Sequence, residues 1–378
     1  MLVVGGGIGG LSAAIAFLQR GVAVDLIEKR PDFEVPGVGL GQPASALRIY
    51  DQFGVLEEIL ATGFHYGHMS IHAPDHSLIA AHRFRMGDDR VPAFCALPRS
   101  RLHRILLDRA TALGVTIRLG TEIASHGGPL GTEITFADGS TATYDLVAGF
   151  DGIRSGVRHH LVGDMFGPRH SGFGAWRLQV ERPEGVTGME FLQGIDGKAG
   201  AIPIGQDRMY LFNIRPETPG VMFAQDQMHV LLAERLSQFG GYVAEIARDL
   251  TPQSPIVYGA LEPFILPHPW HRGAVVVGGD AAHVVPPHLT AGAAMAVEDA
   301  FVLARCLCEG EGTLDVRLQS YGEQRFARNA FVYAFARDWL EAEQAVRSQA
   351  DLDAACAEMA RNASARIAVA DSFLERSI

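Results

Sequence analysis

Residues 1–28 read MLVVGGGIGGLSAAIAFLQRGVAVDLIE, and this stretch decides the fold. A short apolar run is followed by a glycine-rich turn, a helical pattern, a second apolar run and one acidic residue. Gly5, Gly7 and Gly10 match the pattern G-x-G-x-x-G, and Glu28 follows about 20 residues later. This order of strand, turn, helix, strand and acid predicts a βαβ unit that binds a dinucleotide. The pattern does not distinguish FAD from NAD.

Each of these residues has a chemical reason to stand where it does. Gly5 permits a tight turn, Gly7 removes the Cβ that would keep a pyrophosphate from the backbone, and Gly10 lets the helix lie close to the sheet. The free N–H groups at the start of the helix attract phosphates. Glu28 would accept hydrogen bonds from ribose hydroxyls.

The composition is that of a large globular chain. Of its 378 residues 48% are hydrophobic and 20% are charged, which provides a substantial core and excludes wholesale disorder. The net charge is −11, whereas proteins that bind nucleic acid or an anionic membrane usually carry clustered basic residues. The charge therefore argues against both kinds of partner. Four cysteines without a C-x-x-C pair favour a reducing compartment, so we expect a cytoplasmic protein. The uncharged stretch at 1–18 is interrupted by glycines and has no basic leader, which argues against a signal peptide.

Three further segments carry chemistry. Leu97–Leu102, LPRSRL, opens a second helical pattern that contains Arg99. A buried strand over 144–149 runs into Asp151-Gly152, and another over 274–277 leads to Gly279-Asp280. The last of these continues through two prolines to a helix that begins at Gly292.

In combination, these motifs resemble the single-component FAD-dependent aromatic hydroxylases, whose founding member is p-hydroxybenzoate hydroxylase. The likeness covers nearly the whole chain: GGGIGG near residue 5, R-x-x-L at Arg99, D-G at Asp151, and G-D at Asp280 with a downstream E-D. The stretch 287–293, PHLTAGA, is most similar to the branch that acts on salicylate, 3-hydroxybenzoate or 6-hydroxynicotinate.

The resemblance implies an α/β fold in which a Rossmann-like FAD-binding domain is interleaved with a mixed-sheet substrate domain. On this basis we assign residues 1–64, 96–167 and 268–340 to the FAD-binding domain. Residues 65–95 and 168–267 form the expected substrate domain, and 341–378 a helical C-terminal segment.

The resemblance also implies which residues hold FAD. Asp280 would accept hydrogen bonds from ribityl hydroxyls, Arg99 would pair with the pyrophosphate, and the helix from Gly292 would face the flavin pyrimidine ring. Asp151 belongs to a motif associated with FAD and NAD(P)H, but it suits equally a structural role that ties its turn to Arg154 or Arg158. The expected cofactor contacts are Gly5, Gly7, Ile8, Gly10, Glu28, Lys29, Val38, Arg99, Asp151, Asp280, Gly292 and Ala293. Val38 belongs to the glycine-rich stretch 35–41, which we expect to be a loop beside the isoalloxazine.

The implied reaction starts when NAD(P)H reduces FAD and O2 adds to form a flavin C4a-hydroperoxide. Its distal oxygen then attacks an activated aromatic or N-heteroaromatic ring, so the site needs a base that makes the ring electron-rich. His288 is the candidate base, with capping or packing as its equal alternative. Tyr210 would orient a ring hydroxyl unless it only fills the core. Arg177, if not simply exposed, would clamp a substrate carboxylate, and Gln42 is a similar candidate for substrate binding.

Two other interpretations concern function and metals. A non-hydroxylating FAD oxidoreductase, or a flavin-based redox sensor that controls the docking of a partner, stays open as the alternative function. His65, His68, His72 and His76 have helical spacing, but glycine and proline between them argue against a helix, and on strands these spacings mix faces. We therefore expect no metal site.

The partners follow from the reaction and from the charge. We expect a small aromatic substrate, O2 and NAD(P)H, and neither nucleic acid nor a membrane. A homodimer is left open.

Overall fold

The architecture comes from a computed structural model, which describes residues 1–33 and 37–376. Its centre is a six-stranded sheet in which all neighbours pair parallel except the terminal pair β19 and β20. In spatial order the strands are β19 (His271–Arg272), β20 (Val275–Val277), β12 (Val147–Gly149), β1 (Leu2–Val4), β2 (Asp25–Glu28) and β8 (Thr116–Leu119). Because β12, β1 and β2 run parallel, their carboxyl ends meet at one edge, where α/β sheets bind ligands.

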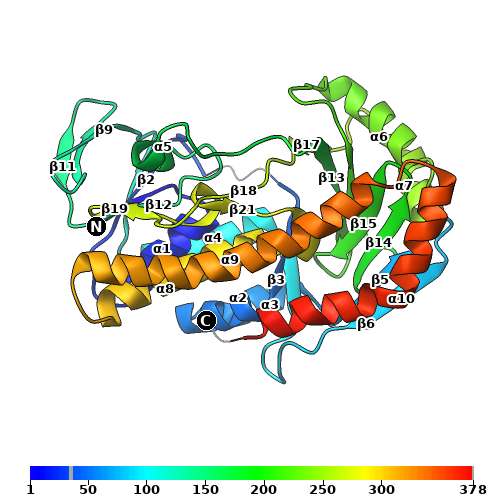
Figure 1. Cartoon of the computed structure of the whole chain (residues 1–378), viewed down its shortest axis with the longest axis horizontal. Helices are drawn as coiled ribbons and strands as arrows, with labels where there is room; N and C mark the ends of the chain where they lie inside the picture. Colours follow the sequence, from blue (N-terminus) through cyan, green and yellow to red (C-terminus); the bar gives the residue numbers. More distant parts are fainter. Residues whose placement is uncertain (34–36, 377–378) are drawn as a thin grey trace.

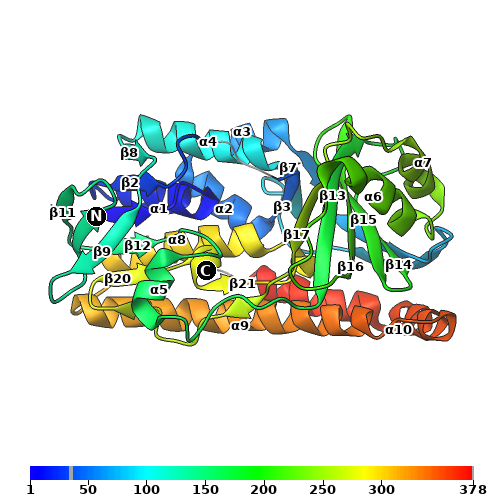
Figure 2. The same ribbon diagram turned by 90° about the horizontal axis from the view of Figure 1, so that it is seen from above.

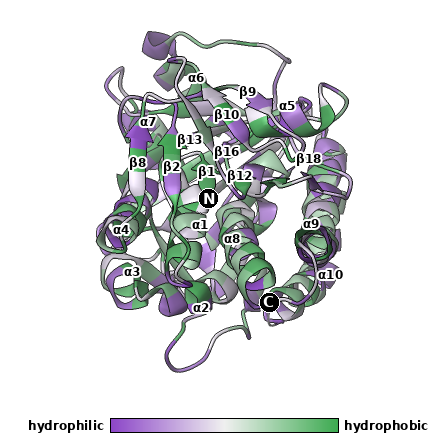
Figure 3. Ribbon diagram, turned by 90° about the vertical axis from the view of Figure 1, so that its left-hand side faces the viewer, coloured by the Kyte–Doolittle hydropathy of each residue, from purple (hydrophilic) through white to green (hydrophobic). Residues whose placement is uncertain are grey.

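Helices lie against one face of this sheet and a smaller sheet covers the other (Figure 1, Figure 3). The helices are α1 (Ile8–Leu18), α4 (Arg99–Ala112) and α8 (Gly292–Glu309). The opposite face carries α5 (Gly156–Val162), β9 (Ile123–Gly127), β10 (Glu133–Phe136) and β11 (Thr141–Thr143). The many glycine and alanine residues of α1 allow it to be buried along almost its whole length, between α4 and α8.

A second sheet has seven strands and is mixed. In spatial order they are β17 (Val257–Ala260), β13 (Phe173–Glu181), β16 (Arg208–Pro216), β15 (Gly197–Pro203), β14 (Met189–Gly194), β5 (His68–His72) and β6 (Leu78–Arg83). Only β14 and β5 pair parallel, because β5 arrives from a distant part of the chain. One face packs on α6 (Met228–Leu236) and α7 (Gly241–Asp249), around the fully buried Trp176, and the short η1 (Gln225–Gln227) precedes α6.

A three-stranded antiparallel sheet links the two larger sheets. It consists of β3 (Gly39–Pro43), β7 (Phe94–Pro98) and β4 (Phe64–Tyr66), with α2 (Ala44–Phe53) and α3 (Leu56–Thr62) beside it. The short elements near the predicted site are β18 (Phe264–Ile265), η2 (Gly279–Ala281), β21 (His283–Val284) and η3 (Pro287–Leu289).

The chain ends in two long helices, α9 (Leu314–Gln344) and α10 (Gln349–Leu374). With 31 residues, α9 is about 46 Å long and lies along both large sheets (Figure 2). It contacts β19 of the first sheet and β15 of the second, whereas α10 packs on β6 and β14. The domain boundary that we placed at residue 340 therefore falls inside a continuous helix.

Most elements lie where the patterns predict them, and two differ. The second apolar run, residues 22–27, predicts a strand that starts at Val22, but the strand begins at Asp25, because Gly21 takes a left-handed φ of +76° and the chain is still turning. The expected loop 35–41 contains the start of β3, which pairs with β7. The part of that loop at 35–36 lies outside the described residues. The interleaved α/β architecture itself is confirmed.

Candidate active site

A long groove runs along the carboxyl end of the six-stranded sheet. It contains about 1140 Å³ of space between atoms, its open mouth included. Its walls come from both halves of the molecule, since the starts of α1 and α8 contribute on one side and β13 and β16 on the other. The lining residues singled out by the sequence are Gly7, Ile8, Arg99, Arg177, Tyr210, Asp280, Gly292 and Ala293.

The glycine-rich turn forms one end of this groove. Gly5 has a left-handed φ of +105°, and a Cβ on it would lie 2.5 Å from the carbonyl oxygen of Phe150. A Cβ on Gly10 would lie 1.8 Å from the carbonyl oxygen of Gly5. A Cβ on Gly7, in contrast, would meet no atom within 4 Å and would project into open space. Gly5 and Gly10 thus serve the fold, while Gly7 keeps the groove free for a ligand.

This difference gives a matched pair of substitutions. Gly7→Ala should leave the unfolding of the cofactor-free protein unchanged and weaken FAD binding about tenfold to a hundredfold, because a displaced pyrophosphate loses charge-assisted hydrogen bonds. Gly10→Ala should destabilise the protein itself. Titration with FAD, alongside urea unfolding of the apoprotein, measures both effects. Equal FAD affinity of Gly7→Ala and the parent would contradict the assignment of the groove.

Glu28 and Lys29 lie at the end of β2, next to the turn. The Glu28 carboxylate accepts hydrogen bonds from the backbone N–H of Gly6 at 2.8 Å and of Arg30 at 3.0 Å. Lys29 is exposed. Neither residue borders the groove in this structure, so their contact with a ribose stays a prediction.

The groove also carries donors and acceptors suited to a dinucleotide. Arg99 is the first residue of α4 and is exposed to the groove, as is Asp280 in η2. α8 begins at Gly292 without a side-chain cap, so its first N–H groups are available to a ligand. A cation, a carboxylate and uncapped amides along one glycine-lined groove fit the phosphates and hydroxyls of FAD.

Asp151 has a structural role in this conformation. Its Oδ1 accepts a hydrogen bond from the Ser155 hydroxyl at 2.5 Å, and its Oδ2 accepts one from the backbone N–H of Val157 at 3.1 Å. It therefore holds the start of α5. The expected partners Arg154 and Arg158 bind elsewhere, the first to Glu262 and the second to backbone carbonyls. Any contact of Asp151 with FAD remains a prediction.

A smaller cavity, which we name the ring chamber, opens from the groove. It contains about 330 Å³ and is lined by Arg177, Phe191, Lys198, Tyr210, Phe212, Ile214, Pro287 and Thr290. Four of these, Arg177, Tyr210, Pro287 and Thr290, also line the groove. The structure thus brings together two of the predicted substrate residues. Burial raises the pKa of Tyr210 to about 12, although Arg177 opposes this shift, so the phenol keeps its proton.

His288 lies in η3, directly after Pro287, and is buried. Its Nε2 lies 3.0 Å from Glu343 Oε2, and Glu343 Oε1 accepts a hydrogen bond from Lys198 Nζ at 2.6 Å. Burial would by itself raise the pKa of Glu343, but His288 and Lys198 outweigh it and lower the pKa to about 2. The ionised carboxylate needs a donor, so Nε2 carries the imidazole proton. His288 Nδ1 is then an acceptor, and it has no hydrogen-bond partner in the part of the chain that the structure describes.

The sequence interpretation missed Lys198 and Glu343. Lys198 did leave a signal, because it is one of only two lysines in the chain and lies among the small apolar residues of β15. Glu343 left none, since it lies near the end of a long charged helix, 55 residues after His288.

Two predicted contacts lie away from the cavities. Gln42 is fully buried, where its Oε1 accepts a hydrogen bond from the Tyr50 hydroxyl and its Nε2 donates one to the carbonyl of Gly41. We therefore leave Gln42 out of the proposed substrate site. Val38 is buried just before Gly39 and does not line the groove.

The prediction that the spacing of the four histidines places them on different faces is wrong for His72 and His76. His72 and His76 do not lie on separate faces, because the turn after β5 brings their rings to a centroid distance of 4.9 Å. Together with Glu190 they offer ligand atoms within 4.8 Å of one another. Both nitrogens of His72 already have hydrogen-bond partners, the carbonyl of His76 and the hydroxyl of Ser70. The expectation of no metal site stays a prediction.

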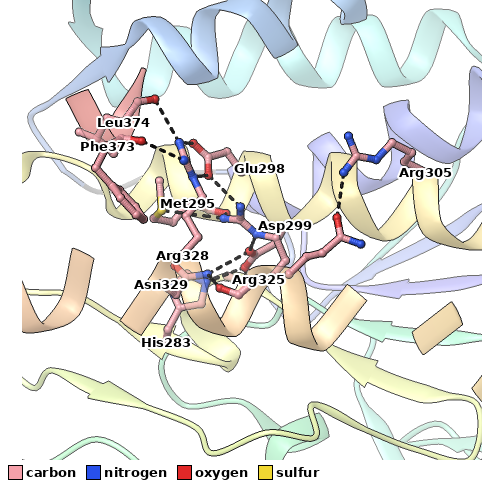
Figure 4. A network of polar contacts seen from close by, with 12 residues as sticks. His283, Met295, Glu298, Asp299, Arg305, Arg325, Arg328, Asn329, Phe373 and Leu374 are labelled. Carbon is pink, nitrogen blue, oxygen red and sulfur yellow. Dashed lines mark hydrogen bonds and ion pairs between the residues drawn. The ribbon is translucent and has the colours of Figure 1, made fainter. Parts of the chain in front are cut away.

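A buried network of charges supports the groove from behind (Figure 4). Asp299 accepts hydrogen bonds from the Gly279 backbone at 2.7 Å and from Arg325 at 2.6 Å, and its Oδ2 lies 2.6 Å from His283 Nε2. Glu298 pairs with Arg325 and Arg328. These two acids serve the fold, since they tie α8 and α9 to the turn that carries Asp280.

Comparison with known proteins identifies the family. A family model described as FAD binding domain matches residues 1–237 and 265–336. The chain belongs to the family of FAD-binding monooxygenases. It is 34% identical to YetM of Bacillus subtilis, provisionally designated an FAD-dependent monooxygenase, over 87% of this chain and 89% of that one.

Two other relatives of this FAD-binding monooxygenase have named reactions. The 2-heptyl-3-hydroxy-4(1H)-quinolone synthase of Pseudomonas aeruginosa is 32% identical, over 88% of this chain and 86% of that one. The 6-hydroxynicotinate 3-monooxygenase of Pseudomonas fluorescens is 28% identical, over 90% and 92%. The fold matches that of Klebsiella pneumoniae HpxO, solved with FAD and uric acid, with a TM-score of 0.87 at 22% identity over 99% and 96% of the two chains.

The cofactor of this flavin-dependent monooxygenase is therefore FAD. The groove, with its glycine turn, Arg99, Asp280 and the start of α8, is the part of the structure that fits it. Across the described residues no helix combines the length and the apolar character needed to span a bilayer.

Proposed function

We propose that this monooxygenase hydroxylates an activated aromatic or N-heteroaromatic ring held in the ring chamber, with His288 as the base. The observation that carries the proposal is His288 Nδ1, a buried acceptor without a protein partner in the described chain. His288 lines the neighbouring cavity, which shares Phe191 and Lys198 with the ring chamber. Burial lowers the pKa of His288 although Glu343 opposes the shift, so the imidazole is neutral near pH 7 and able to take up a proton. Removing the hydroxyl proton makes the ring electron-rich.

Glu343 and Lys198 act through His288. The Glu343 carboxylate fixes the orientation and the tautomer of the His288 imidazole. It also stabilises the imidazolium that forms when Nδ1 is protonated. Lys198 holds the carboxylate in its ionised form. We regard both as positioning residues.

The other walls of the chamber hold the ring. Tyr210 retains its hydroxyl proton and can donate it in a hydrogen bond to a ring oxygen. Arg177, from the neighbouring strand, is a cation that stabilises a phenolate. Phe191, Phe212 and Ile214 supply an apolar surface for the ring face.

FAD bound in the groove supplies the activation of O2, and we propose NAD(P)H as the reductant. Phosphate contacts fall to Gly7 and Arg99, with Asp280 at the ribityl chain and the start of α8 at the pyrimidine ring. Membership of a monooxygenase family favours oxygen transfer over the redox-sensor alternative.

The names of two relatives support the ring class. One makes a 3-hydroxy-4(1H)-quinolone and the other acts on 6-hydroxynicotinate, and both names describe hydroxylated nitrogen heterocycles. We therefore propose that the substrate of this chain is a hydroxylated N-heterocycle or a phenol, consistent with the branch indicated by residues 287–293.

A substrate screen tests this function. FAD-loaded protein in air is mixed with NADH or NADPH and with hydroxypyridines, hydroxyquinolines or phenolic acids. We expect at least one compound to accelerate nicotinamide oxidation and to gain one oxygen atom in its mass. The matched control is the parent ring without a hydroxyl group, which offers His288 no proton and should not be converted. The proposal is wrong if neither nucleotide reduces the flavin or if no hydroxylated ring is converted.

A further inference from the structure

A third cavity lies beyond the ring chamber, and we name it the apolar chamber. The space between its lining atoms is about 690 Å³, its mouth included. Methionine and aromatic side chains dominate its wall, among them Met69, Met86, Met189, Met359, Phe84 and Trp339. Methionine is flexible and polarisable, so a wall with four of them adapts to chains of different shape.

The three cavities form a series. The groove and the ring chamber share Arg177 and Tyr210, and the ring chamber and the apolar chamber share Phe191 and Lys198. No residue is common to the groove and the apolar chamber. A ligand with its ring beside the FAD groove would therefore extend a substituent past Lys198 into the apolar chamber.

The charged groups in this wall already have partners. Lys198 and Glu343 pair with each other, and Asp371 accepts hydrogen bonds from the backbone N–H of Arg85 and Met86. Among described residues, two buried polar atoms of the lining have no partner, His288 Nδ1 and Trp339 Nε1. Neither is a fixed charge, so the chamber offers nothing to balance a carboxylate on the substituent.

The outer wall is made by the C-terminal helices. Trp339 lies on α9, and Met359 and Ala370 lie on α10. Figure 1 shows α10 against the strands β5 and β6. The chamber lies between α10 and a wall formed by β5, β14 and η3. Ala370 is 1% exposed, whereas its neighbour Val369 on the same helix is 56% exposed.

We propose that the substrate carries an uncharged alkyl chain on its ring, and that the apolar chamber under α9 and α10 binds this chain. The inference rests on the proposed function for the position of the ring, but it makes its own claim about affinity. Each methylene that enters the chamber should tighten binding about fourfold, the value expected for a buried CH2 group.

The test is a binding titration that requires no turnover. The probes are two homologous series from methyl to nonyl, 4-alkylphenols and 2-alkyl-4-hydroxyquinolines, added to the FAD-loaded protein without NAD(P)H and followed by calorimetry. We expect the Kd of at least one series to fall with chain length, and a chain ending in a carboxylate to bind more weakly than its methyl-ended analogue. A Kd independent of chain length, or no binding by either series, would overturn the inference.

Variants locate the chain. Ala370→Phe fills the chamber and should abolish the gain from long chains while leaving the Kd of the methyl homologue within about twofold, which corresponds to about 0.4 kcal/mol. Val369→Phe adds the same group to the exposed side of α10 and should leave the whole series unchanged. If Ala370→Phe does not fold, Met359→Phe, at a half-buried position of the same wall, replaces it. Equal effects of the lining and control variants would overturn the location.

The outcomes separate this inference from the proposed function. Tight binding of long chains without oxygen transfer to any of them would contradict the proposed function and leave the apolar chamber as the binding site. Hydroxylation of short and long homologues with equal Kd would support the proposed function and overturn the chain-binding role.

Discussion

His288→Ala should lower the rate of hydroxylation by about 10²–10⁴-fold, the usual contribution of a positioned general base. The variant should still fold, because Glu343 keeps its ion pair with Lys198 at 2.6 Å. Oxidation of NADH should continue in the presence of substrate, but its product should be mainly hydrogen peroxide. Product yield per NADH, measured together with peroxide, gives both quantities.

The pH profile distinguishes a base from a packing residue. Because burial lowers the pKa of His288, the acid limb of kcat/KM in the parent should lie below the ordinary imidazole value of about 6.5. His288→Ala should lack this limb. His159→Ala, at an exposed position, serves as the control and should match the parent. If His288→Ala forms as much product per NADH as the parent and keeps the acid limb of kcat/KM, His288 is not the base.

Asp299→Ala should cost about 3–5 kcal/mol of unfolding free energy, the typical effect of breaking a buried ion pair. The substitution removes one of the two carboxylates that pair with Arg325, and it removes the acceptors of His283 and the Gly279 backbone. Burial would raise the pKa of Asp299, but His283 and Arg325 outweigh it and hold the pKa below its ordinary value. The stabilisation is therefore present above about pH 4 and is lost as the pH falls further.

Urea unfolding at matched FAD saturation measures this cost. The control is Asp108→Ala, which removes an aspartate from an exposed pair with Arg104 on α4 and should cost only about 0.3–0.5 kcal/mol. A loss at Asp299 as small as the loss at Asp108 would show that the network in Figure 4 does not hold α8 and α9 together.

The cofactor half of the site could be predicted from sequence because its geometry is local. Gly5 and Gly10 are required by the fold, because Gly5 has a left-handed φ and a Cβ on either residue would clash with a carbonyl oxygen. Gly7 follows from the spacing of the motif. Arg99 and Gly292 are both first residues of helices, and the sequence pattern predicts where a helix begins. Glu28 was placed correctly at the end of β2, yet its carboxylate binds backbone N–H groups rather than bordering the groove.

The substrate half depends on contacts between distant segments. His288, Lys198 and Glu343 come from three different elements, and no spacing in the sequence relates them. The apolar chamber is closed by α10, whose helical pattern was visible but whose packing partner was not. The hydrogen bond between Gln42 and Tyr50, which lies on the following helix, could not be read from the sequence pattern.

Isotope labelling tests the central claim most directly. FAD-loaded protein, the best substrate from the screen and NAD(P)H are incubated under 18O2 in ordinary water, and the product is analysed by mass spectrometry. We predict one 18O atom in each hydroxylated ring. A product whose new oxygen comes from water, or NAD(P)H oxidation that yields only peroxide with every ring tested, would contradict the account.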